Sequence, residues 1–237
     1  MFAGHIGAGL ALGRLDRRIN VAWFVTAALL LDIALWILVL LGLESVTIPT
    51  DFRRTHQVAF SFPYSHGLTS AIVWSSAVAV CCLSVPRSHP EGRSRLALLL
   101  AAAVFSHWLL DALVHRPELP LLGNMSPRVG MSLWDHTALA VFAESLVVVA
   151  GLLIFVPTSL TTVPRTAALI GVVALTLALT VVGMTMSPPP PSAAAMAISS
   201  LVTLGVVVAL VGWLTKARPS TVREATPNHS LQRTNPR

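Results

Sequence analysis

Charged residues and cysteines are scarce in this chain of 237 residues. Only 11% of the positions are Asp, Glu, Lys or Arg, against about 25% in typical soluble domains. The two cysteines, Cys81 and Cys82, are adjacent and lie inside an apolar run, which argues against a disulfide framework as the basis of the fold. With 54% hydrophobic residues and a mean hydropathy of +0.75, the composition excludes an ordinary soluble globular protein.

The hydrophobic residues gather into runs of about 20, the length that an α-helix needs to cross a bilayer. The sequence therefore predicts an all-α, polytopic membrane helical bundle with about six transmembrane helices. Phe2–Leu15 is apolar and glycine-rich but too short to span, so we expect an N-terminal membrane-inserted half-helix there. The predicted spans are residues 21–43, 66–85, 96–115, 137–156, 167–186 and 193–214.

These runs predict one integral-membrane helical domain over residues 1–215. Residues 1–156 form its site-bearing part, because every ionisable residue inside a span lies there, and residues 157–215 add two further spans. Residues 216–237 are polar and rich in Pro, Asn, Thr and Arg, a composition that predicts a disordered tail.

The net charge of +6 lies in short loops beside the apolar runs, which favours membrane topology over nucleic-acid binding. With six spans, twelve of the 16 basic residues fall on one side of the bilayer, together with the tail. The positive-inside rule then makes the C-terminus cytoplasmic. The four basic residues on the opposite side are Arg53, Arg54, Arg116 and Arg128.

His107 and Asp111 lie inside the third predicted span, four residues apart, and so project from one face of a helix. Ionisable side chains at such depth are expensive and usually mark a site, although a structural hydrogen bond between the two is an equal alternative on this pair alone. His115 lies one further turn along, where it reads as a helix end. Glu144, in the fourth span, is either a partner that orients a ligand histidine or a lone carboxylic acid.

Other ionisable residues are predicted to reach the same depth. If Phe2–Leu15 turns back near Arg17, His5 and Asp32 lie roughly 18 and 21 Å above that turn at 1.5 Å per residue. His66 begins the second span on the same side as Asp111. Imidazole and carboxylate together are the ligand set of zinc and related divalent metals. The predicted metal ligands are His5, Asp32, His66, His107 and Asp111, and Asp32 and Asp111 are also the candidate catalytic carboxylates.

Several short motifs, in this order and spacing, resemble the YdjM-like family of bacterial inner-membrane metal-dependent hydrolases, the LexA-regulated type. The resemblance covers roughly residues 1–125. One departure is that the family often shows Pro-Asp-x-Asp-His at the first carboxylate, whereas Asp32 here stands alone in Leu31-Asp-Ile-Ala. The motifs are His5 in a glycine-rich segment, Asp32, Pro63-Tyr-Ser-His66, Ser106-His-Trp-Leu-Leu-Asp111 and Leu119-Pro-Leu-Leu122.

The resemblance implies a multi-pass protein of the bacterial inner membrane that binds a divalent metal, zinc in the first place. The implied activity is hydrolysis of a phosphoester of a lipid or envelope metabolite at the outer membrane face, with the lipid bilayer as the surrounding partner. Two alternatives stay open: a small transporter or permease with an intramembrane relay, and a non-catalytic membrane protein. The relay would comprise Asp32, His107, Asp111 and Glu144. The sequence does not decide the oligomeric state.

Overall fold

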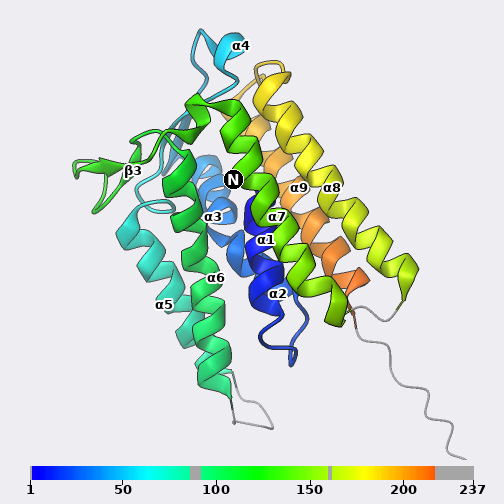
Figure 1. The fold of residues 1–237 in the computed structure, drawn as a ribbon. Coiled ribbons are helices and arrows are strands. Elements are labelled where there is room, and N and C mark those ends of the chain that lie inside the picture. Colours follow the sequence, from blue (N-terminus) through cyan, green and yellow to red (C-terminus); the bar gives the residue numbers. More distant parts are fainter. Residues whose placement is uncertain (1, 86–91, 160–161, 217–237) are drawn as a thin grey trace, which may run out of the picture.

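The computed structural model describes residues 2–85, 92–159 and 162–216, and these are mostly helical (Figure 1). The long helices run side by side in a bundle, as the apolar runs predict. The predicted tail lies outside the described residues except for Lys216. The α-helices are α1 (Phe2–Gly13), α2 (Ala22–Ala28), α3 (Leu30–Leu40), α4 (Phe52–Thr55), α5 (Leu68–Ser84), α6 (Arg93–Val114), α7 (Thr137–Ser159), α8 (Val163–Thr185) and α9 (Ala193–Leu214).

Four helices, α6 to α9, are each long and apolar enough to cross a membrane. The first predicted span is not one straight helix, because it breaks at Leu29 into α2 and α3, which are bent by 56° relative to each other. Counted together, this pair makes a fifth candidate span. The chain thus has the features of a multi-pass membrane protein.

The predicted count of six spans is not supported, because the second predicted span is short. Its helix, α5, has 17 residues and starts only at Leu68, after a turn that contains Pro63 and Gly67. At 1.5 Å per residue α5 is about 26 Å long, less than the roughly 30 Å of a bilayer core.

The outward faces of the bundle are apolar. Large hydrophobic side chains are more than half exposed on α6, α7, α8 and α9, among them Leu98, Leu153, Leu175 and Val202. Soluble proteins rarely expose contiguous apolar surface of this kind, whereas lipid chains solvate it. Hydrophobic residues also fill the interior, where Phe24, Leu31 and Leu100 belong to one cluster of buried side chains.

Helix α1 lies inside this bundle, packed against α2, α6 and α7 (Figure 1). Helices α1 and α7 approach so closely that a Cβ atom on Gly7 would overlap the backbone of Val147, and one on Gly151 would overlap the backbone of Gly7. Gly9 likewise leaves no room for a side chain beside Val25 of α2. A short helix is therefore held at the centre of the fold, as the glycine-rich segment predicts.

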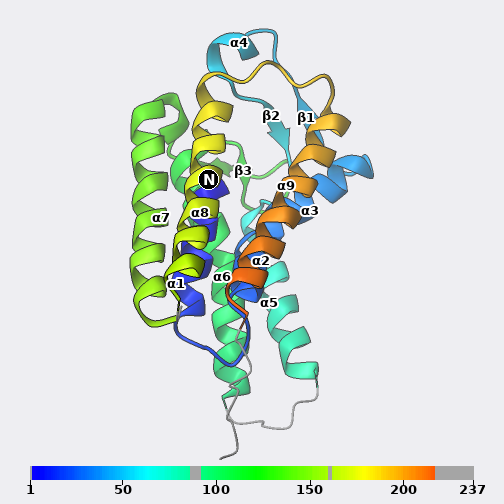
Figure 2. The ribbon, with the colours of Figure 1, turned by 90° about the vertical axis from the view of Figure 1, so that its right-hand side faces the viewer.

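Two antiparallel strand pairs and α4 lie at one end of the bundle (Figures 1 and 2). The strand pairs are β1 (Ser45–Thr47) with β2 (Ala59–Ser61), and β3 (Leu119–Pro120) with β4 (Arg128–Val129). The turn of residues 14–20 lies at the opposite end with the last residues of α9, where the Asn20 amide donates to the Gly212 carbonyl at 2.9 Å. The end with the strands is the end toward which the candidate site faces.

Candidate metal centre

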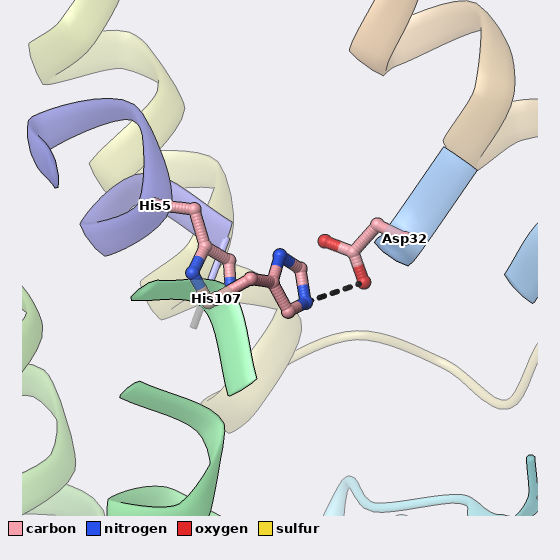
Figure 3. Close-up of side chains that lie close together, drawn as sticks. All are labelled: His5, Asp32 and His107. Atoms are coloured by element: carbon pink, nitrogen blue, oxygen red, sulfur yellow. Dashed lines mark ion pairs between the residues drawn. The ribbon is translucent and has the colours of Figure 1, made fainter. Parts of the chain in front are cut away.

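The five predicted ligand residues come together inside the bundle from four separate parts of the chain. His5 lies on α1, Asp32 on α3, His66 in the turn before α5, and His107 and Asp111 on α6. One potential ligand atom from each of His5, Asp32 and His107 lies within 4.8 Å of the others, and the same is true of His66, His107 and Asp111. Figure 3 shows how the His107 ring is placed between His5 and Asp32.

Asp111 is the centre of this group. Its carboxylate oxygens lie 3.1 Å from His5 Nε2, 3.2 Å from His107 Nε2 and 3.4 Å from His66 Nε2. All four side chains are at most 2% exposed. A carboxylate in so dry a place needs compensating positive charge or hydrogen bonds, and every neighbour here is an imidazole that can supply one or ligate a cation.

The break between α2 and α3 shapes the second side of the site. The Ala28 carbonyl, at the end of α2, lies 2.7 Å from His107 Nδ1, which donates to it. Asp32 lies in the first turn of α3, where the partial positive charge of a helix N-terminus stabilises a carboxylate. Its oxygen lies 3.5 Å from His66 Nε2 and 3.7 Å from His107 Nε2. The break thus orients one imidazole and places one carboxylate.

A chain of hydrogen bonds orients His66. Buried Glu44 accepts the backbone N–H groups of Tyr64 and Ser65 at 2.8 and 2.9 Å, and the Ser65 hydroxyl donates to its second oxygen at 2.7 Å. The same hydroxyl lies 2.8 Å from His66 Nδ1. Because its single proton is directed to Glu44, the Ser65 oxygen accepts from His66 Nδ1–H. Glu44 and Ser65 therefore hold the ring with Nε2 toward the site.

These hydrogen bonds leave the Nε2 atoms of His66 and His107 unprotonated, so that their lone pairs point toward each other. A carbonyl only accepts, so the proton of neutral His107 is on Nδ1, and the Glu44–Ser65 chain puts that of neutral His66 on Nδ1 as well. The two Nε2 atoms are 3.1 Å apart. Two lone pairs at that distance repel each other unless a cation lies near both. His5 Nδ1 adds a buried ring nitrogen with no hydrogen-bond partner in the described part of the chain. The donor set fits a divalent transition metal.

Of the two roles that the sequence left open for Glu144, the structure shows the satisfied carboxyl group, with backbone N–H groups of α1 as its partners. Its Oε1 atom accepts the backbone N–H groups of Ala3 and Gly4 at 2.7 and 3.1 Å, and the side chain is buried. The first N–H groups of a helix have no partner within the helix, and those of α1 point into the protein interior. Glu144 satisfies two of them and so fixes the helix that carries His5.

His115 belongs to the site, contrary to its interpretation as an exposed helix end. It is 4% exposed, its Nε2 lies 3.6 Å from Asp111 and its Nδ1 lies 2.7 Å from the Glu118 carboxylate. Trp134 covers the ring, with centroids 3.9 Å apart. His107, Asp111 and His115 are spaced four residues apart and therefore share one face of the helix. This spacing was the sequence signal that could have assigned His115 to the site. Glu44 and Ser65 give no such signal.

A cavity of about 560 Å³ adjoins the site. Asp32, His66, Asp111 and His115 form part of its lining, so the cavity borders the candidate site. Asp32, with 21% of its side chain exposed, is much the more accessible of the two carboxylates. The arrangement can therefore bind a metal through buried ligands and present one carboxylate to a molecule in the cavity.

Comparison of the chain with protein-family models, with curated proteins and with solved structures gives no match.

Proposed function

We propose that the protein is a membrane-embedded, metal-dependent hydrolase that cleaves a phosphoester of a lipid or envelope metabolite. The observation that carries the proposal is the opposed pair of His66 and His107 Nε2 atoms, 3.1 Å apart beside the Asp111 carboxylate. Such a group of imidazoles and carboxylates is typical of hydrolytic zinc sites. The motif resemblance to YdjM-like proteins points to the same chemistry.

His5, His66, His107 and Asp111 would hold the metal, with Asp32 as a further ligand or as the general base. A divalent metal bound there supplies Lewis-acid activation of water and of a phosphoryl oxygen. Asp32 suits the role of base, because it is the more exposed of the two candidate carboxylates that line the cavity. In the reaction the oxygen of water bonds to phosphorus, the P–O bond to the alcohol breaks, and the leaving alcohol takes up a proton.

We also propose that the protein lies in the inner membrane and that its site lies toward the outer face. The cavity beside the site is lined by Phe52 and Thr55 of α4, and Figure 2 shows the Arg14–Asn20 turn at the opposite end of the bundle from α4. The basic residues of that turn favour the cytoplasm by the positive-inside rule. The site would then open toward the outer face.

A permease is the second candidate, and the break at Leu29 is the observation that favours it. Discontinuous helices whose ends meet at mid-depth are a recurrent feature of transporter ion sites. A permease would use Asp32, His107 and Asp111 as a proton or ion relay and would need no tightly bound transition metal.

Metal analysis of detergent-purified protein separates the two. We expect zinc or another divalent transition metal at about one per chain or more in wild type, and depletion in His107→Ala and Asp111→Asn. His136→Ala, at an exposed histidine, is the matched control and should retain the metal. Wild-type protein that is metal-free and indifferent to added zinc and to chelator would contradict the hydrolase and favour the permease.

A further inference from the structure

The cavity beside the candidate metal centre extends well beyond the residues that hold the metal. Its far walls are Leu179, Gly183 and Met184 of α8 with Met196, Thr203 and Leu204 of α9. Figure 2 shows α8 and α9 diverging toward the link that connects them, residues 186–192. We call this part of the cavity the α8–α9 chamber. It is built by the two helices that lie beyond the region of the motif resemblance.

The α8–α9 chamber is mainly apolar, and most of its hydroxyl-bearing lining residues donate to carbonyl groups of their own helices. The hydroxyls of Thr180, Ser199 and Thr203 donate to carbonyls of their own helices, Thr176, Met196 and Ser199, at 3.0, 3.0 and 2.8 Å. Hydroxyl donors satisfied in this way do not require water or a polar ligand. The chamber therefore offers little to a water-soluble metabolite and much to a hydrocarbon chain.

His56 and Gln57 line the cavity at the end that carries α4. His56, in a left-handed conformation with a φ of 50°, lies with its Nδ1 atom 3.0 Å from the Ser187 carbonyl at the end of α8. Gln57 donates to the Trp134 carbonyl at 3.0 Å. These contacts connect the segment after α4 to the end of α8 and to Trp134 at this end of the chamber.

We infer that the α8–α9 chamber binds the hydrocarbon chain of a lipid phosphoester whose headgroup lies at Asp32 and Asp111. The inference rests on the proposed function and narrows its substrate to a lipid. One cavity joins a charged end to an apolar end, and its volume is within the roughly 300–1,000 Å³ of ligand sites. A chain that enters from the bilayer exchanges one apolar environment for another and is not exposed to water.

Photo-cross-linking tests the binding directly, without a need for turnover. The probe is hexadecyl phosphate with a diazirine in its chain, added to wild-type protein in detergent. We expect labelled peptides from the chamber walls of α8 and α9, competed by unlabelled hexadecyl phosphate and not by butyl phosphate. Labelling confined to residues outside the chamber, or equal competition by butyl phosphate, would overturn the inference.

Two glycines of α8 provide a matched pair of variants. A Cβ atom at Gly183 or at Gly171 has no neighbour within 4 Å, but only Gly183 lines the chamber. Gly183→Phe should fill the chamber and lower its labelling about tenfold or more, because the ring takes the space of the chain. Gly171→Phe should leave labelling unchanged. Thr203→Phe fills the chamber from α9 and keeps the test decisive if Gly183→Phe does not fold.

Metal content, measured on the same samples, separates failure of the inference from failure of the proposed function. If wild type contains metal and the Gly183→Phe and Thr203→Phe variants are labelled as strongly as wild type, the result contradicts the lipid-chain site and leaves the proposed hydrolase standing. Wild type without metal contradicts the hydrolase. If metal-free protein is still labelled in the chamber, the chamber binds lipid for another purpose. That result would contradict its role as a substrate site together with the hydrolase.

Discussion

The carboxylate of Glu144 lies 2.7 Å from the backbone nitrogen of Ala3, although the two residues are 141 positions apart in the chain. The contact joins the middle of α7 to the first turn of α1. It satisfies a helix terminus that the bundle buries, and a carboxylate is the group that a helix N-terminus favours. The position of His5 in the site depends on this contact.

Replacement of Glu144 tests that role. Glu144→Ala leaves two buried N–H groups without an acceptor, so we expect it to lower the free energy of unfolding by about 2–4 kcal/mol. Glu144→Gln keeps an acceptor oxygen and should cost clearly less. Thermal unfolding in detergent measures both. Equal stability of Glu144→Ala and wild type would show that α1 is held without this cap.

Because α1 and α7 approach closely at Gly7, replacement of Gly by Ala should have different effects at Gly7 and at Gly205. Gly7→Ala should displace α1, lower the unfolding temperature and reduce metal content, because its Cβ atom overlaps the Val147 backbone. Gly205→Ala, on α9, has open space and should be neutral or stabilise the helix by up to about 1 kcal/mol. If both variants behave alike, the glycine contact does not position His5.

The hydrogen-bond chain from Glu44 through Ser65 to His66 predicts a loss of metal affinity without loss of a ligand. Ser65→Ala removes the acceptor of His66 Nδ1–H, and we expect metal affinity to fall about 10- to 100-fold, as for other partners of ligand histidines. Competition with a metal-binding dye measures the affinity. Ser75→Ala, which removes a buried hydroxyl bonded within α5, is the matched control. Unchanged affinity in Ser65→Ala would exclude the orienting role.

Topology gives a prediction that is independent of the metal. Reporter fusions after Leu214 should behave as cytoplasmic, because the end of α9 lies at the same end of the bundle as the turn that carries Arg14, Arg17 and Arg18. Fusions within the segment between α6 and α7, near Met125, should behave as external. A periplasmic signal after Leu214 would reverse the proposed orientation and place the site toward the cytoplasm.

The sequence by itself determined the helical membrane character and indicated which His and Asp residues lie together in the candidate site. Helical hydrogen bonds and side-chain periodicity are local, so runs of about 20 apolar residues and the spacing of His107 and Asp111 indicate helices and a shared face. Counting residues from one turn also sufficed to bring His5 to the level of Asp32, because the rise of a helix per residue is constant.

Only the tertiary structure decided the break at Leu29, the short α5 and the contacts that orient the ligands. The Ala28 carbonyl is freed where His107, 79 residues away, donates to it, and Ser65 reaches Glu44 across 21 residues. Such partners leave no periodic trace in the sequence, since each satisfies a polar group that becomes buried only when distant helices pack. For the same reason no local pattern marked Glu144 as the cap of α1 or α8 and α9 as walls of a chamber, because both depend on which helices become neighbours.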